Sequence, residues 1–481
     1  MTLAQRSVRS AGYTIASSGF QALIQFVRSI VLARLLLPAQ FGVYAYAASL
    51  VMLTHALPGF GMGAALVHRA RQSEGETARR VHFTLTVLFN LLWVAGVGAL
   101  APWFIPPQNR WVLWTILLSR AAQHLTGTAR VTLTRKVAFR RVALLDGSRA
   151  LLTTLTAIFL AWRGAGLWSL VSTDILAALI SLAGFYLIRP VWRPRFGWER
   201  ETAAYLLDFG KRTTGGIIIL QMLDRVDDLW TGRFLGDAPL GFYSRAYTFA
   251  TYPRKLFASP INQVVSGTYA ALKGKPKRLS QAFFRVNAFL IRSGFFLAGL
   301  LFLLVPEFIH FVIGDKWLPM MTPFRLMLVY TLLDPIKVST GNIFIAVGRP
   351  EILTRARLWQ LGVMLLGLFT LGPRWGIEGV ALAVDIMLAF GIGILFWEAR
   401  PYVRFSVRAL FGAPLLALGS GLLLAWGLLV QLVGLSPWWS LAVKMSAFSG
   451  SYAILLGLLE GRHIRYWWHE GKRFLLKKTT P

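Results

Sequence analysis

Long apolar stretches recur along the whole chain and leave no room for a soluble domain. Of its 481 residues, 56% are hydrophobic and only 15% are charged, whereas soluble domains carry about 25% charged residues. A run of about 18 or more apolar residues is long enough to cross a bilayer as a helix. Because backbone groups inside lipid must find their hydrogen-bond partners within the segment, such runs are helical. The sequence therefore predicts an all-α polytopic membrane protein with about 14 transmembrane helices.

The expected spans follow one another with short connections, of which the longest is near 189–212. Pro253 and Pro260 lie inside one long span and are expected to break or bend it. Since the number of spans is even, both termini are expected on the same side. The spans lie near 10–36, 41–66, 81–105, 111–130, 145–162, 165–188, 208–233, 238–272, 285–313, 317–347, 352–373, 377–398, 407–433 and 437–459.

Basic residues are distributed unequally between the two sides of this layout, and the formal net charge is +31. Most Lys and Arg residues lie in or beside the segments on the side of the termini. Cytoplasmic loops of membrane proteins collect Lys and Arg, so the sequence predicts a multi-pass protein of the bacterial cytoplasmic (inner) membrane with both termini inside. This orientation accounts for the charge without nucleic acid. The opposite loops hold only Arg110, Arg163, Arg233, Lys316 and Arg374.

Tryptophans and the C-terminal tail indicate contacts with the bilayer surface. The tail "KRFLLKK" is expected to set orientation and to attract anionic membrane lipids. Seven tryptophans near outer span ends are expected to form an interfacial belt. They are Trp103, Trp111, Trp162, Trp317, Trp375, Trp438 and Trp439.

Two segments repeat with a shift of 199 residues. "VRSIVLARLLLPAQFGVYAYA" (27–47) aligns with "VDDLWTGRFLGDAPLGFYSRA" (226–246), and a weaker echo relates "GAGLWSLVSTD" (164–174) to "GIEGVALAVD" (376–385). Because the shift covers six helices, the two copies have the same orientation and are related by an axis along the membrane normal. The repeat predicts two pseudo-symmetric six-helix lobes, residues 1–200 and 201–400, followed by two C-terminal helices and a basic cytoplasmic tail in residues 401–481. The coinciding pairs are Val27/Val226, Arg34/Arg233, Leu36/Leu235, Ala39/Ala238, Gly42/Gly241, Tyr44/Tyr243 and Ala47/Ala246.

The second copy carries carboxylates within a span. Asp224, Asp227 and Asp228 follow i, i+3, i+4 spacing, which places them on one helix face. Arg225 can reach Asp228 at i+3. Each charge at the centre of a span costs about 2.5–3.5 kcal/mol if it faces lipid, so these side chains are expected to face a protein partner or water.

The first copy carries a matching polar stripe, in which Arg28 and Gln25 stand where the second copy has Asp227 and Asp224. Two related stripes favour a water-filled cavity between the lobes. The alternative is that the charges are interhelical ion pairs that hold the bundle together. Further charges within spans include Arg120, Asp174, Arg245, Arg254, Lys255, Asp334, Lys337 and Asp385.

The residue types allow three kinds of chemistry. Arginines suit an anionic headgroup, because a guanidinium binds phosphate through two parallel hydrogen bonds. Carboxylates stacked on one face repel each other, which favours exchange of a proton or binding of Na⁺. "DRVDD" could also hold Mg²⁺ on a diphosphate in a membrane enzyme, but such enzymes use two acidic clusters and the sequence has one. No phosphate-binding GxxxxGK[ST], HExxH or GxSxG motif is present, so we expect no enzyme activity, no cofactor and no metal.

Several segments resemble a known family. "LLLPAQFGVYAYAASL", "GFGMGAALV", "RKVAFRRVALLDGSRALL" and, as the most specific, "DRVDDLWTGRFLGDAPLGFYSRAYTFATYP" are similar to the bacterial polysaccharide flippases of the Wzx type. These belong to the multidrug/oligosaccharidyl-lipid/polysaccharide exporter superfamily. The resemblance covers about residues 10–400, and it implies two six-helix lobes that alternate between inward-open and outward-open states.

The resemblance also implies a substrate and partners. The substrate would be an undecaprenyl-diphosphate-linked oligosaccharide, moved from the cytoplasmic to the periplasmic leaflet for O-antigen, exopolysaccharide or capsule synthesis. The expected partners are this lipid-linked oligosaccharide, membrane lipids and the polysaccharide polymerase and glycosyltransferase machinery. The last two helices would either hold the lipid tail in a groove or simply face lipid. The rival interpretations are a cation-coupled drug exporter of the same superfamily and a membrane enzyme acting on polyprenyl diphosphates.

Site residues follow from the family's cationic central cavity and from the acidic stripe. Which lobe would hold the headgroup stays open, because the stripe of the second lobe is acidic. Candidates for the diphosphate or the cavity wall are Arg28, Arg34, His55, Arg120, Arg245, Arg254 and Lys255. Candidates for ion coupling or pairing between lobes are Asp224, Arg225, Asp227 and Asp228.

Overall fold

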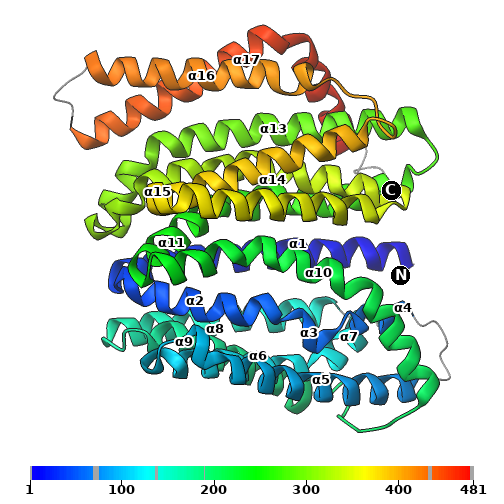
Figure 1. Cartoon of the computed structure of the whole chain (residues 1–481). Helices are drawn as coiled ribbons and strands as arrows, with labels where there is room; N and C mark the ends of the chain where they lie inside the picture. Colours follow the sequence, from blue (N-terminus) through cyan, green and yellow to red (C-terminus); the bar gives the residue numbers. More distant parts are fainter. Residues whose placement is uncertain (1–2, 69–74, 136–138, 189, 432–435, 477–481) are drawn as a thin grey trace. The chain divides into compact units, whose positions relative to one another are not determined.

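The described chain is built from α-helices and short helical turns (Figure 1). A computed structural model describes residues 3–68, 75–135, 139–188, 190–431 and 436–476. Within these residues, eight helices are long and apolar enough to cross a membrane. The predicted fold class, an all-helical multi-span membrane protein, is confirmed.

The helices group into two compact units. The first unit contains Met1–Leu256 and Thr354–Met387, and the second contains Phe257–Leu353 and Leu388–Pro481. The units are not the predicted lobes, since residues 201–256 belong to the first unit. The lobes 1–200 and 201–400 are inferred from a sequence repeat and not from compactness, so they stay a prediction.

The first unit holds the N-terminal helices and the helices of the second repeat copy. Within it, α1 packs against α8, α8 against α9, α9 against α6, and α2 against both α10 and α11. Both polar stripes thus lie in one compact body. Its helices are α1 (Leu3–Leu35), α2 (Pro38–Thr54), α3 (Ala56–Gly59), α4 (Met62–His68), α5 (Gly75–Phe104), α6 (Arg110–Leu125), α7 (Gly127–Arg135), α8 (Phe139–Trp162), α9 (Trp168–Leu182), α10 (Arg200–Phe234) and α11 (Asp237–Pro253).

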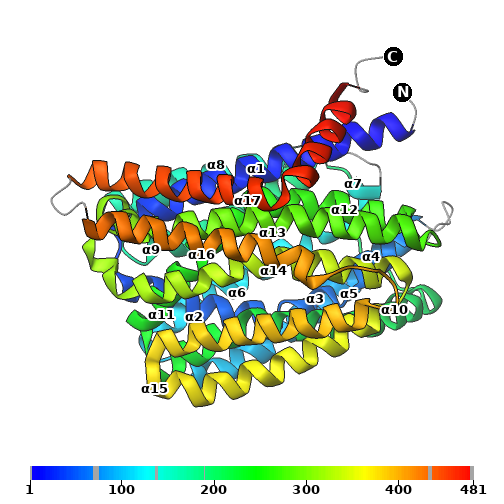
Figure 2. The same ribbon diagram turned by 90° about the horizontal axis from the view of Figure 1, so that it is seen from above.

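The second unit is organised around α13, against which α14, α16 and α17 pack; Figure 2 shows α16 and α17 running alongside it. Trp317 is completely buried in this unit. Its placement in the interfacial belt was therefore wrong, because it packs in the interior. The helices are α12 (Ser259–Ala271), α13 (Pro276–Glu307), α14 (Met321–Val347), α16 (Val407–Gln431) and α17 (Pro437–Leu476), while α15 (Pro350–Ala399) contributes to both units.

The predicted helix breaks coincide with residues that disturb helical geometry. Helix α11 ends at Pro253, and a π-helical turn leads into α12, as expected for a proline that removes a backbone donor. Within α15, Gly376 has φ 57° and ψ −135°, so the kink falls between the two spans expected there. The predicted connection near 189–212 is shorter than expected, because α10 already begins at Arg200.

Candidate functional site

The two repeat segments meet through a pair of glycines in the first unit. A Cβ atom added to Gly42 of α2 would lie 1.7 Å from the carbonyl oxygen of Asp237, and one added to Gly241 of α11 would lie 1.9 Å from that of Pro38. Only residues without a side chain allow the two backbones to come this close. Because Gly42 and Pro38 are the repeat equivalents of Gly241 and Asp237, each copy makes the same contact with the other.

Asp228 connects α10 to α2. It is 9% exposed, and its Oδ2 accepts a hydrogen bond from the Ser49 hydroxyl at 2.9 Å. The guanidinium of Arg225, one turn earlier, lies 3.5 Å from the same oxygen. The structure thus contains the Arg225–Asp228 pair that the spacing predicts. The charge of Arg245 also interacts with Asp228, so two cations partly compensate this buried carboxylate.

Asp227 connects α10 to α11. Its Oδ2 accepts a hydrogen bond from the Tyr243 hydroxyl at 2.6 Å, and its buried Oδ1 has no hydrogen-bond partner among the described residues. Asp224, by contrast, is exposed and interacts electrostatically with Arg357. The three carboxylates thus have different surroundings, since Asp227 accepts a hydrogen bond from α11, Asp228 accepts one from α2, and Asp224 is exposed.

Arg28 and Arg245 bring two positive charges together between α1 and α11. Arg245 donates to the Ser29 hydroxyl at 3.3 Å and lies over the Phe41 ring at 4.6 Å, while its Nε is buried without a partner among the described residues. Arg28 is half-buried and close enough to Arg245 for the charges to interact. Within the described chain, Arg28 makes no ion pair or hydrogen bond. Asp228 interacts electrostatically with Arg245, so the described residues compensate only part of the positive charge of this pair.

Arg120 of α6 forms the best-compensated ion pair of the site. Its Nη2 lies 2.8 Å from Asp174 of α9, and the Tyr44 hydroxyl donates to the other oxygen of Asp174 at 2.7 Å. Tyr44 interacts electrostatically with both Arg120 and Arg28. Arg28 of α1 and Arg120 of α6 thus both lie near Tyr44. Asp174 contacts Tyr44 and Arg120.

The remaining cationic candidates lie in different surroundings. His55, at the end of α2, meets His124 edge to face with ring centroids 4.5 Å apart, and Arg120 lies near both rings. Lys255 lies over the Tyr252 ring at 5.1 Å. Arg254 occupies the π-helical turn after α11, and Arg34 is exposed in the last turn of α1.

Sequence reasoning did not assign roles to Tyr44, Tyr243 and Ser49. The repeat contained a signal for the tyrosines, since Tyr44 and Tyr243 are equivalent and each donates to a buried aspartate. Nothing in the sequence distinguishes Ser49 from other serines. A further cluster was also missed: Arg130 binds Asp146 at 2.7 Å, and Arg149 lies 3.3 Å from the same carboxylate.

The cluster is suited to binding an anion. Arg28, Arg120 and Arg245 come from three helices, and Asp174 compensates only Arg120 directly. The described residues contain no group of three or more His, Cys, Asp or Glu side chains that could hold a metal ion. The chemistry on offer is therefore multidentate hydrogen bonding to an anion, for which planar guanidinium groups are well shaped.

Residues 31–322 match the family described as "Polysaccharide biosynthesis protein". Among curated proteins, the chain is 28% identical over 283 residues to the succinoglycan biosynthesis transport protein ExoT of Rhizobium meliloti (strain 1021), a match that covers 58% of this chain and 57% of ExoT. It is 23% identical over 399 residues to the lipopolysaccharide biosynthesis protein WzxC of Escherichia coli (strain K12), covering 79% of this chain and 78% of WzxC. The match thus spans less than two thirds of the length of ExoT and more than two thirds of the length of WzxC.

Solved structures share the fold at low identity. The lipid II flippase MurJ in an inward closed conformation superposes with a TM-score of 0.74 at 15% identity, covering 94% of this chain and 99% of that chain. An inward-facing multidrug resistance MATE family transporter of the MOP superfamily superposes with a TM-score of 0.60 at 14% identity, covering 79% and 94%. Both comparisons establish the architecture.

Proposed function

The chain belongs to the polysaccharide biosynthesis protein family of membrane transport proteins, and from this premise we propose that it translocates an undecaprenyl-diphosphate-linked oligosaccharide. The transfer runs from the cytoplasmic to the periplasmic leaflet by alternating access, with both termini in the cytoplasm. The product serves the synthesis of a surface polysaccharide.

The observation that carries this proposal is that two positively charged side chains, Arg28 and Arg245, lie close together. Two guanidinium groups interact across α1 and α11, and within the described residues neither has a carboxylate in an ion pair. Each charge held inside the membrane without compensation costs about 2.5–3.5 kcal/mol. A diphosphate would supply two or more negative charges and a set of oxygens for both guanidinium groups.

In this proposal the headgroup site lies where the two repeat copies meet. Arg28 of α1 belongs to the first copy and Arg245 of α11 to the second. The Gly42–Gly241 contact holds α2 and α11 together at the end where both helices begin. On the predicted orientation this end faces the periplasm, so the site is closed on that side and the substrate enters from the cytoplasm. Outward release then requires α2 and α11 to separate there.

Asp227 and Asp228 are proposed to couple transport to an ion gradient. Moving one charge across the membrane is worth about 2.3 kcal/mol per 100 mV, but arginines that neutralise the diphosphate reduce this drive. A carboxylate that takes up H⁺ or Na⁺ restores a driving force. The unpartnered Oδ1 of Asp227 supports this role.

Deleting the gene and identifying the saccharide that accumulates tests the proposal. We expect loss of surface polysaccharide and accumulation of a polyprenyl-diphosphate-linked oligosaccharide on the cytoplasmic side, with recovery when the wild-type gene is returned. Normal polysaccharide combined with increased drug sensitivity would instead identify a drug exporter of the same superfamily. Loss of polysaccharide without any accumulated lipid-linked saccharide would place the protein elsewhere in the process.

A further inference from the structure

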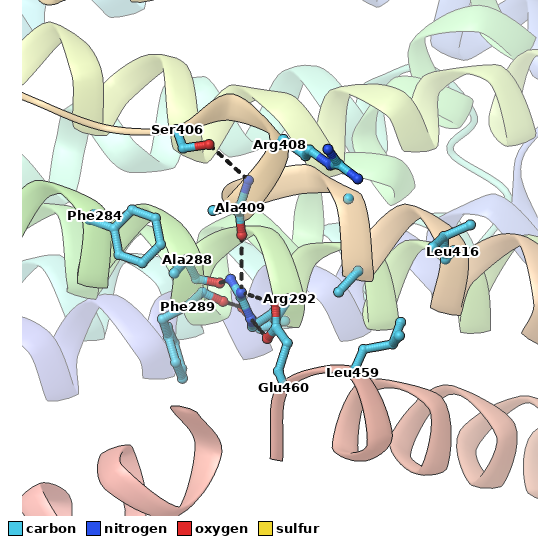
Figure 3. A pocket seen from close by; sticks show the side chains of 13 residues that line it. Phe284, Ala288, Phe289, Arg292, Ser406, Arg408, Ala409, Leu416, Leu459 and Glu460 are labelled. Atoms are coloured by element: carbon cyan, nitrogen blue, oxygen red, sulfur yellow. Dashed lines mark hydrogen bonds and ion pairs between the residues drawn. The ribbon is translucent and has the colours of Figure 1, made fainter. Parts of the chain in front are cut away.

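A cavity of about 740 Å³ lies in the second unit between α13, α16 and α17. Its lining residues all belong to the second unit and include none of the arginines Arg28, Arg120 and Arg245. Its polar lining includes Arg292, Glu460, Ser406 and Arg408 (Figure 3). A cavity of this size accommodates a small ligand or a lipid headgroup, since ligand sites range over about 300–1,000 Å³.

Arg292 and Glu460 neutralise each other across the cavity wall. The guanidinium donates from Nε to Oε2 at 2.7 Å and from Nη2 to Oε1 at 2.5 Å. It also donates to the carbonyl oxygens of Ala288 at 2.8 Å and Ala409 at 3.5 Å, as Figure 3 shows. Because the two charges are opposite, the Arg292–Glu460 pair contributes no net charge to the cavity.

Arg408 supplies a charge that the surrounding described residues leave uncompensated. It lines the cavity and is exposed, and no described carboxylate pairs with it. Beside it, the Ser406 oxygen accepts a hydrogen bond from the Ala409 amide at 3.3 Å. The hydroxyl hydrogen of Ser406 is therefore available to a ligand. Together these groups offer one positive charge and a hydrogen-bond donor to the cavity.

The cavity also has an apolar wall, whose side chains are exposed at the surface of the second unit. Phe289 is 52% exposed, Leu416 is 62% exposed and Leu459 is 51% exposed, and all three line the cavity. A ligand that fits both walls has a small anionic end and a hydrocarbon chain. Free phosphate would leave the apolar wall uncovered.

We propose that this cavity binds an anionic glycerophospholipid, with its phosphodiester at Arg408 and Ser406 and an acyl chain along Phe289, Leu416 and Leu459. The net charge of the cavity favours this lipid over a polyprenyl diphosphate. One phosphodiester carries a single negative charge, which matches the single uncompensated charge of Arg408. A polyprenyl diphosphate brings at least two negative charges, and the Arg292–Glu460 pair gives it no second cation. Charge-assisted hydrogen bonds to phosphate are about twice as strong as neutral ones, so Arg408 dominates the affinity.

The experiment measures lipid binding to the purified full-length protein in detergent. Phosphatidylglycerol is titrated while thermal unfolding and bound lipid are recorded, and phosphatidylcholine with the same acyl chains serves as the neutral comparison. We expect phosphatidylglycerol to raise the unfolding temperature and phosphatidylcholine to have a much smaller effect. Arg408→Gln should weaken phosphatidylglycerol binding by about tenfold or more. The matched control is Arg374→Gln, which removes an exposed arginine of the first unit and should leave binding unchanged.

A second variant fills the cavity without removing charge. A Cβ atom added to Gly412 meets only the Cγ of Arg408, at 3.8 Å, so the backbone tolerates a side chain there. We expect Gly412→Leu to fold normally and to lose the phosphatidylglycerol-dependent stabilisation. Equal stabilisation by both lipids, or unchanged binding in Arg408→Gln and Gly412→Leu, would overturn the proposal. Displacement of phosphatidylglycerol by farnesyl diphosphate, in an Arg408-dependent manner, would also overturn it by assigning the cavity to prenyl diphosphates.

Discussion

Gly42 of α2 and Gly241 of α11 make the same contact in opposite directions. Gly42 lies against the backbone of Asp237, the first residue of α11, and Gly241 lies against Pro38, the first residue of α2. Both helices therefore begin at the same end of the first unit. This reciprocity is what a two-fold relation between repeat copies produces, and it supports an axis along the membrane normal.

Alanine at either glycine should separate α2 from α11. The new Cβ would lie within 2 Å of a backbone carbonyl oxygen, which a rotamer change cannot relieve. We expect Gly42→Ala or Gly241→Ala to destabilise the closed contact by about 1–3 kcal/mol, seen as a lower unfolding temperature and faster labelling of nearby introduced cysteines. The chain has no native cysteine, so such labels are specific.

Gly215→Ala is the matched control for this prediction. Gly215 also lies in a helix of the first unit, but an added Cβ meets no atom within 4 Å. Helical alanine is favoured over glycine by about 0.5–1 kcal/mol, so this variant should be neutral or stabilised. Equal effects of all three substitutions would show that the reciprocal contact is not tight.

Arg28→Ala should abolish surface polysaccharide without destabilising the protein. Arg28 interacts with another cation and forms no ion pair with the described residues, so its removal relieves repulsion. The measurements are polysaccharide in a complemented deletion strain and the unfolding temperature of the purified protein. Arg292→Ala provides the contrast, because it leaves Glu460 without its ion-pair partner and should lower the free energy of unfolding by about 3 kcal/mol. A comparable loss of stability in Arg28→Ala would indicate a structural role for Arg28.

Asp227→Asn should uncouple transport from the ion gradient. The amide retains the size of the carboxylate and can keep the contact with Tyr243, but it cannot exchange a proton or neutralise a cation. In reconstituted vesicles we expect translocation to become insensitive to imposed H⁺ and Na⁺ gradients. Asp208→Asn is the control, since Asp208 is an exposed residue of α10 that pairs with Arg212. Unchanged gradient dependence in Asp227→Asn would leave Asp227 as a structural residue.

Two ion pairs should hold α17 against α13. Arg292 pairs with Glu460, and Lys444 pairs with Glu307, about 15 residues away along both helices. Glu307→Gln should lower stability by about 3 kcal/mol because it leaves Lys444 without its partner. Replacing both residues with apolar ones, as in Glu307→Leu with Lys444→Met, should restore most of that loss. An additive effect of the two substitutions, measured by denaturant or thermal unfolding, would contradict the pairing.

The sequence by itself predicted the protein family and several local structural features correctly. The resemblance to Wzx-type proteins is confirmed by the family match over residues 31–322, and the chain is accordingly a transport protein and not an enzyme. The helix breaks at Pro253 and Gly376 follow from the backbone properties of proline and glycine, which the sequence alone gives. The tryptophan belt was only partly predictable: Trp103 is 72% exposed while Trp317 is buried, because a position near a span end does not say what packs over it.

The length of the apolar runs determined the helices of this protein, because the need to satisfy backbone hydrogen bonds within lipid leaves a chain few alternatives. The shift of 199 residues similarly determined that two copies exist. Only the tertiary structure decided which charges meet. Asp227 and Asp228 are neighbours in sequence, yet Tyr243 of α11 binds one and Ser49 of α2 binds the other. Helix geometry specifies the direction of a side chain, but the partner it finds depends on which distant helix packs there. For the same reason, the sequence could propose Arg28 and Arg245 separately, while the packing of α1 beside α11 brought them together.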